Sequence, residues 1–85
     1  MSKKTKERLR LLHAKTLSSE EGCRLLILSG WRRIRKTVGR KKTGTSHQYF
    51  LNDELKLETC VPGGKHELSD TVCEVLQKLA ALSGD

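Results

Sequence analysis

The stretch SHQYFLNDELKLETCVP, residues 46–62, decides the fold. Two runs rich in aromatic, leucine and β-branched residues flank the turn-forming pair Asn52-Asp53, so they predict antiparallel strands over residues 46–51 and 55–62. Pro62 closes the second strand, because proline donates no hydrogen bond to a β-ladder. Alternate residues of that strand share one face: Leu55, Leu57, Thr59 and Val61.

A helix and a further strand are predicted before this hairpin. Ser18 to Glu21 offers a capping box and Gly30 is a usual helix terminator, so a helix should lie between them. The apolar face of that helix should be Cys23, Leu26 and Ile27, flanked by Leu25 and Leu28. The segment WRRIRKTV, residues 31–38, then alternates apolar and basic residues and predicts the first strand. Its covered side should carry Ile34 and Val38, and its cationic side Arg33 and Arg35.

A second helix is predicted after Pro62, with Ser69 or Asp70 as its cap. Its apolar stripe should be Val72, Val75, Leu76, Leu79 and Ala80. The order is therefore α-β-β-β-α, and the fold class is α+β with a three-stranded antiparallel sheet. Both helices are expected on one face of the sheet, because that arrangement buries both apolar stripes and leaves the other face in water.

The chain of 85 residues is one small domain with no room for a large substrate cavity. Residues 17–85 hold the predicted elements, and residues 1–16 form a basic N-terminal extension, either a short amphipathic helix or disordered. Any chemistry should take place on a surface.

The charge is unevenly distributed along the chain. Residues 1–44 carry 14 Lys and Arg against three Glu, a net charge of +11, whereas residues 45–85 have a net charge of −4 from three Lys and seven acids. A cationic half of this size releases counterions on meeting a polyanion, so nucleic acid is the first partner class and an anionic membrane the second. A merely solubilising surface is the plain alternative.

The three cysteines are widely spaced and form no CxxC pair, and the N-terminus has no apolar stretch of signal-peptide length. The longest apolar run, residues 25–28, cannot span a bilayer. A cytoplasmic location with no membrane contact is therefore expected. Zinc bound by Cys60, His66 and Cys73 is conceivable, but the spacing fits no standard zinc site, so buried thiols are favoured and no metal or cofactor is predicted.

One histidine stands at the start of the second strand. If Phe50 faces the helices, alternation places His47 and Tyr49 on the uncovered face, alongside Arg33 and Arg35. If Tyr49 faces the helices instead, His47 is partly buried. Imidazole both accepts and donates a proton near neutral pH, and Tyr49 would offer a ring on which a base can stack.

This arrangement suits RNA cleavage. A base takes the proton of the 2′-OH, which attacks the adjacent phosphate while cations stabilise the developing charge. DNA lacks that internal nucleophile, and no carboxylate cluster for a metal stands out, so RNA is the expected substrate. A nucleophilic pair of Cys60 with His47 is a weaker alternative, because no third orienting group is evident.

The order of motifs resembles the HicA family of toxin–antitoxin modules over about residues 18–82. The resemblance rests on Ser29-Gly30-Trp31, the basic strand, Gly44-Thr45-Ser46-His47 with its aromatics, Val61-Pro62, Glu67-Leu68 and the last helix. Here Thr45 stands between Gly44 and Ser46, where the family has glycine and serine adjacent. The resemblance implies a fold similar to a double-stranded-RNA-binding domain and an endoribonuclease that cleaves mRNA until a HicB-type antitoxin neutralises it.

The resemblance also places the catalytic residue at His47. Phosphate and base contacts are expected from Arg33, Arg35, Arg40, Lys41, Lys42 and Tyr49. Two other function classes remain open: a noncatalytic RNA-binding module on the same scaffold, and an interaction protein whose basic half docks an acidic protein.

Overall fold

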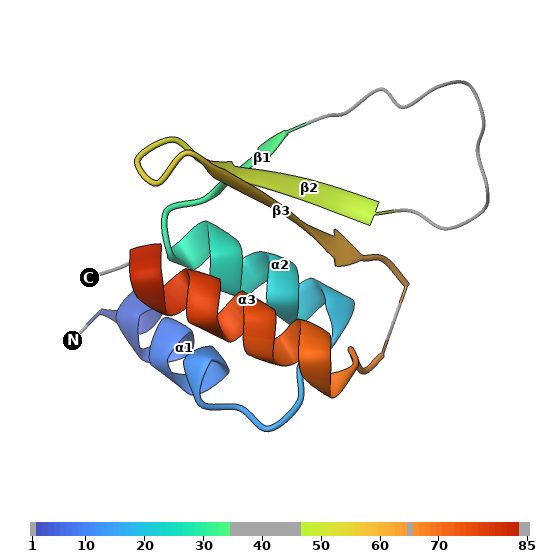
Figure 1. Cartoon of the computed structure of the whole chain (residues 1–85). Coiled ribbons are helices and arrows are strands. Elements are labelled where there is room, and N and C mark those ends of the chain that lie inside the picture. The colour runs from blue at the N-terminus through green and yellow to red at the C-terminus, as the bar shows by residue number, and fades with distance from the viewer. Residues whose placement is uncertain (1, 35–46, 65, 84–85) are drawn as a thin grey trace, which may run out of the picture.

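The computed structural model describes residues 2–34, 47–64 and 66–83. The elements in chain order are α1 (Lys3–Leu12), α2 (Ser19–Leu28), β1 (Arg32–Ile34), β2 (His47–Asn52), β3 (Leu57–Pro62) and α3 (Asp70–Ser83), as Figure 1 shows. The strands form one antiparallel sheet in the order β1-β2-β3. The predicted α+β class with a three-stranded antiparallel sheet is confirmed, and a third helix precedes the expected pattern.

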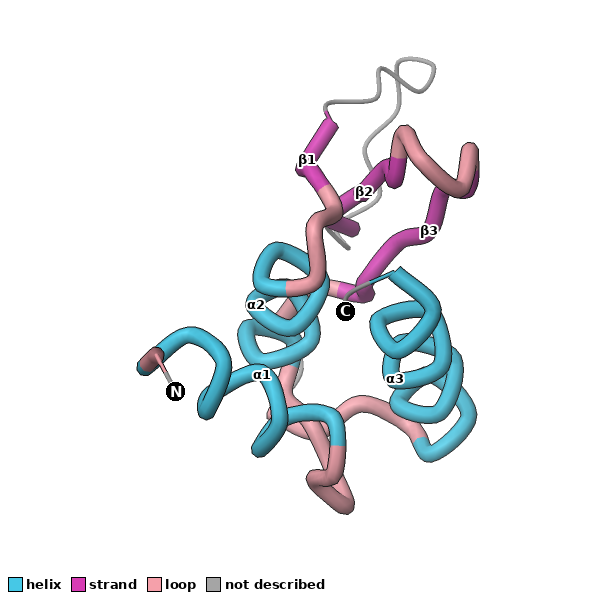
Figure 2. Tube along the Cα trace, turned by 90° about the vertical axis from the view of Figure 1, so that its left-hand side faces the viewer, coloured by secondary structure: helices cyan, strands magenta, loops and turns pink. Residues whose placement is uncertain are grey.

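The three helices lie on one side of the sheet. Helices α2 and α3 cover that side, and α1 packs against both of them on the side that faces away from the strands (Figures 1 and 2). The other side of the sheet carries no element in the described part of the chain (Figure 2). This uncovered side is the one on which sequence alternation placed His47.

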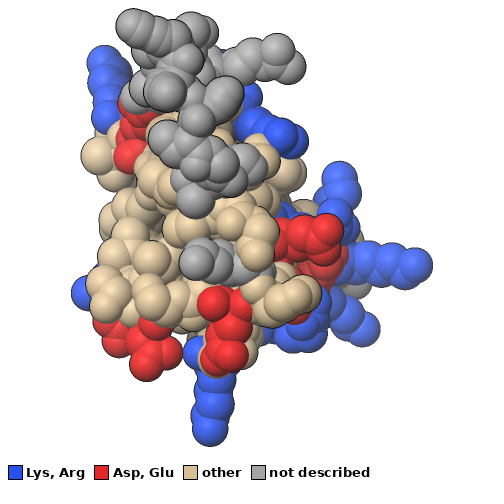
Figure 3. All heavy atoms as spheres, turned by 90° about the vertical axis from the view of Figure 1, so that its right-hand side faces the viewer, with Lys and Arg blue, Asp and Glu red and all other residues tan. Residues whose placement is uncertain are grey.

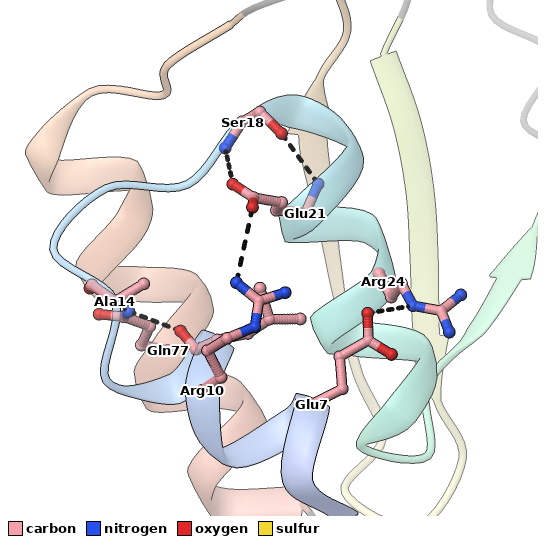
Figure 4. A network of polar contacts seen from close by, with 8 residues as sticks. Glu7, Arg10, Ala14, Ser18, Glu21, Arg24 and Gln77 are labelled. Carbon is pink, nitrogen blue, oxygen red and sulfur yellow. Dashed lines mark hydrogen bonds and ion pairs between the residues drawn. The ribbon is translucent and has the colours of Figure 1, made fainter. Parts of the chain in front are cut away.

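The signals predicted for helix α2 are present at both of its ends. At the N-terminus, the Ser18 hydroxyl accepts a hydrogen bond from the backbone N–H of Glu21 at 3.2 Å, and the Glu21 carboxylate accepts one from the N–H of Ser18 at 3.0 Å (Figure 4). At the C-terminus, Gly30 has a φ of 93°, which only glycine adopts freely. Trp31 N–H then donates to Leu26 C=O at 3.0 Å, closing the helix in a Schellman motif.

The core lies between the sheet and the helices and includes residues from the N-terminal segment. Its largest fully buried side chains are Phe50, Leu11, Leu17, Leu25, Leu26, Leu76 and Val61. Helix α2 comes close to α3 at Gly22, where an added Cβ would lie 2.9 Å from Leu76 Cδ1. Cys73 and Ala80 complete the buried face of α3. The prediction that Ile27 and Val75 belong to the core was wrong. Both lie beside the buried stripes of their helices, and their side chains are 54% and 45% exposed.

Helix α1 is held in place by polar contacts as well as by Leu11. The Arg8 guanidinium donates to Ser29 Oγ at 2.8 Å and to Ala80 C=O at 3.0 Å. Glu7 pairs with Arg24 of α2 at 2.6 Å (Figure 4). The Gln77 amide of α3 donates hydrogen bonds to the backbone carbonyls of Leu11 and Ala14, which lie at the C-terminal end of α1 and just after it. Of the two alternatives for residues 1–16, the helix is the one present: it spans Lys3–Leu12 and is docked against α2 and α3.

Phe50 and Tyr49 offer a direct test of which face of β2 is buried. Phe50→Ala should lower the free energy of unfolding by about 3–5 kcal/mol, because a fully buried aromatic side chain leaves a cavity. Tyr49→Ala, one residue away on the uncovered side, should cost about 1 kcal/mol. Urea denaturation of both variants measures the difference. A larger loss for Tyr49→Ala would mean that the strand faces the opposite way.

Candidate functional site

The register of the sheet determines which side chains share its uncovered side. Phe50 lies opposite Arg33 on β1 and Thr59 on β3, and it is fully buried toward the helices. Residues directly opposite one another in an antiparallel pair point to the same side of the sheet. The side turned away from the helices therefore carries Arg32, Ile34, His47, Tyr49, Leu51, Glu58, Cys60 and Pro62, which we call the open face. The expectation that Phe50 points inward is confirmed.

His47 is exposed at the start of β2, where it pairs with Pro62. Its ring stacks against that of Tyr49, with centroids 6.5 Å apart and planes inclined by 29°. Tyr49 is half-buried between Ile34 and Cys60, its partners on the two flanking strands. The imidazole is therefore accessible, and it lies next to a row of half-buried side chains across the sheet, Ile34, Tyr49 and Cys60.

Arg33 does not lie beside His47 as predicted, and Ile34, expected on the covered side, lies opposite Tyr49 on the open face. Arg33 is opposite Phe50 and so points to the helix side, where its charge acts on Cys23 of α2. The reason is Trp31, which is buried and donates its indole N–H to Ser83 Oγ at 2.7 Å. An inward Trp31 places the side chain two residues later on the same side. Arg33 is nevertheless exposed, because among the described strands β1 lies at the edge of the sheet.

Arg32, which the sequence reading did not select, is the cation that β1 presents on the open face. It lies opposite Leu51, and its guanidinium pairs with the Asp53 carboxylate at 2.8 Å. This hydrogen bond lowers the pKa of Asp53 and raises that of Arg32. Because side chains alternate along a strand, a buried Trp31 implies that Arg32 points to the opposite side. The large apolar Trp31 was therefore the signal that could have identified Arg32. The expected contacts Arg35, Arg40, Lys41 and Lys42 lie outside the described residues.

The three cysteines occupy different environments. Cys60 lies on the open face, whereas Cys73 is buried on the helix side, so these two cannot bind one metal ion with His66. The described residues contain no group of three or more His, Cys, Asp or Glu side chains placed to hold a metal.

The alternative nucleophilic pair of Cys60 with His47 is offset along the strands, because Cys60 is opposite Tyr49 and His47 is opposite Pro62. Burial raises the pKa of the Cys23 thiol, with Arg33 acting in the opposite direction.

A groove of about 510 Å³ runs along the helix side of the sheet edge. Arg33 and Gln48 contribute from the strands, and Cys23, Arg24 and Ile27 from α2. Its charges are largely compensated, because Glu20 lines the same groove and Arg24 is paired with Glu7. Sequence reasoning did not find this groove, since it depends on how α2 lies against the strands.

Comparisons with protein-family models, with curated proteins and with solved structures find no match to this chain. Within the described residues, no helix is long and apolar enough to cross a membrane.

The cysteines allow the two sides of the sheet to be probed in the native protein. Brief treatment with iodoacetamide near neutral pH should modify Cys60 first, because it lies on the open face and Cys73 is only 3% exposed. Cys23 should react slowly, since its raised pKa lowers the fraction of reactive thiolate. Peptide mass spectrometry gives the three rates, with urea-unfolded protein as the control. Equal rates for Cys60 and Cys73 in the native protein would contradict the packing of α3.

Proposed function

We propose that this protein is a ribonuclease of the HicA toxin type, which binds mRNA on the open face and cleaves it with the imidazole of His47. The observation that carries the proposal is an exposed imidazole on an uncovered sheet, stacked on the ring of Tyr49. Single-stranded RNA is commonly held by bases that stack on such aromatic side chains. The sequence just before His47 adds five Lys and Arg, at positions 35, 36 and 40–42, to which a phosphate chain would be attracted.

In this mechanism His47 moves one proton. Neutral imidazole takes the proton of a 2′-OH, and the freed oxygen attacks the adjacent phosphorus. The bond from phosphorus to the 5′-oxygen breaks, and that oxygen takes the proton that His47 now carries. The products are a 2′,3′-cyclic phosphate and a 5′-hydroxyl end, and His47 returns to its neutral form. Arg35, Arg40, Lys41 and Lys42 are the proposed cations for the charge that builds on the phosphoryl oxygens.

A HicB-type antitoxin is the proposed protein partner, seated on the open face so that it covers His47. The half-buried row of Ile34, Tyr49 and Cys60 supports a protein contact there, because apolar and aromatic side chains are enriched at the centres of interfaces. An acidic surface around that centre would complement the net positive charge of the chain.

The second candidate function is a noncatalytic RNA-binding module on the same scaffold. The position of Arg33 favours it, because that cation is on the helix side and cannot stabilise a phosphate held at His47. Among the described residues of the open face, Arg32 is the one Lys or Arg, and it is paired with Asp53. In this version His47 and Tyr49 bind a base or a phosphate without proton transfer.

Cleavage of a labelled single-stranded RNA by purified protein separates the two candidates. His47→Ala should lower the cleavage rate by at least about a hundredfold, the usual contribution of a general base, while RNA affinity changes little. Gln48→Ala, the next residue on the opposite side of the strand, should cleave at the normal rate. The fragments should end in a 2′,3′-cyclic phosphate, and a 2′-deoxy substrate should remain intact.

Two outcomes would decide against the ribonuclease. Normal cleavage by His47→Ala would remove that residue from the mechanism. RNA binding without cleavage by the wild-type protein, together with weaker binding by Tyr49→Ala, would establish the noncatalytic module instead.

A further inference from the structure

Helix α1 carries a row of cations on the side turned away from the core. Lys3, Lys6 and Arg10 follow one another at i, i+3 and i+7, so they lie on one face of the helix, and all three are exposed. We call this row the α1 stripe. Within the described residues Lys3 and Lys6 have no ion-pair partner, and Arg10 reaches Glu21 only at 3.9 Å (Figure 4). In Figure 3 the Lys and Arg side chains are most numerous on the right-hand side, where Asp and Glu side chains lie among them.

The stripe is presented by a docked helix. Arg8, on the opposite side of α1, donates to Ser29 Oγ and Ala80 C=O, and Leu11 is fully buried in the core. The Gln77 amide holds the C-terminal end. The direction in which the stripe points is therefore fixed by the fold, so a ligand that binds it does not have to order this segment first.

The position of these lysines works against the stability of α1 itself. The N-terminus of a helix is its positive end, which favours acids and disfavours cations. Helices α2 and α3 follow this rule, with Glu20 and Asp70 among the acids of their first turns, whereas the first turn of α1 has no acid and begins with Lys3 and Lys4. A basic residue that destabilises its own helix, with no contact that offsets the loss, points to a role in binding.

We propose that the α1 stripe is a second RNA-binding surface, which holds the phosphodiester backbone without reading its sequence. The proposal rests on the proposed function for its choice of RNA as the polyanion. An anionic membrane fits less well, because a helix that lies in a membrane inserts its apolar face. Here that face is used by the core, where Leu11 is buried and Leu12 is packed, and only Leu9 is left 39% exposed.

Helix α1, which carries the stripe, and the sheet lie on opposite sides of the layer formed by α2 and α3 (Figures 1 and 2). A short oligonucleotide can therefore occupy one surface at a time, whereas a longer RNA can follow the surface and occupy both. Two linked contacts raise the apparent affinity without any new contact, so long RNA should bind more tightly than short RNA.

The test measures RNA affinity against salt concentration for the full chain and for Lys3→Gln/Lys6→Gln. With a single-stranded RNA of about 40 nucleotides, the slope of log K against log salt should fall by about 1.4, roughly 0.7 for each lost phosphate contact. At about 50 mM salt the affinity should weaken at least tenfold. Lys56→Asn is the matched control, because it removes one exposed lysine in the β2–β3 turn and asparagine tolerates the φ of 55° there. It should leave the slope unchanged.

Folding is controlled by a second variant, Lys3→Glu/Lys6→Glu. It places acids at the positive end of α1, so its Tm should equal or exceed that of the wild type while RNA binding weakens further. An unchanged salt slope in both double variants at normal Tm would overturn the proposal. Loss of binding to anionic lipid vesicles with unchanged RNA affinity would also overturn it, in favour of a membrane surface.

Failure of the stripe and failure of the ribonuclease give different results. If His47→Ala cleaves RNA normally but Lys3→Gln/Lys6→Gln binds it weakly, the stripe stands and the nuclease assignment falls. If His47→Ala is inactive but the stripe variants bind normally, the nuclease stands and the stripe falls.

Discussion

Burial of Phe50 is the constraint on which the rest of the structure depends. Side chains alternate along a strand, so the inward Phe50 places Tyr49 outward and His47 with it. A register or parity slip of one residue would move all three to the other side of the sheet and expose an aromatic ring that contributes several kcal/mol of packing. The accessibility of the imidazole is therefore secured by the same contact that stabilises the domain, and not by any interaction of His47 itself.

Local signals predicted most of the architecture. The capping box at Ser18 and the glycine terminator at Gly30 each act over a few residues, and both are present in the structure. The alternation predicted over residues 55–62 holds for 57–62, whereas Leu55 lies in the turn before β3. The same locality explains why residues 1–16 were left open between helix and disorder. The docking of α1 depends on Gln77 and Ala80, which are far away in the sequence and leave no periodic signal near Leu11.

The wrong predictions have a common physical cause: sequence patterns did not decide which of two adjacent residues on a helix or strand faces the core. In the predicted strand 31–38 the apolar residues do not agree on one side: Ile34 and Val38 share one parity and Trp31 has the other, and the buried Trp31 decides it. Arg33 was therefore assigned to the wrong side, and Arg32 was overlooked. Likewise Ile27 and Val75 lie one residue from the buried stripes of their helices, where a side chain is apolar but uncovered. For the candidate site, the position of His47 followed from sequence, but the side of the sheet taken by its neighbouring cations did not.

The contact between the Arg8 guanidinium and the Ala80 carbonyl joins residues 72 positions apart and ties the first helix to the last. During synthesis α1 is made before its partners on α3, so the nascent chain carries an undocked basic helix until α3 has left the ribosome. Closure of the core must wait for the final turns of α3. Folding of this domain is then expected to be a single event that begins only once α3 is available.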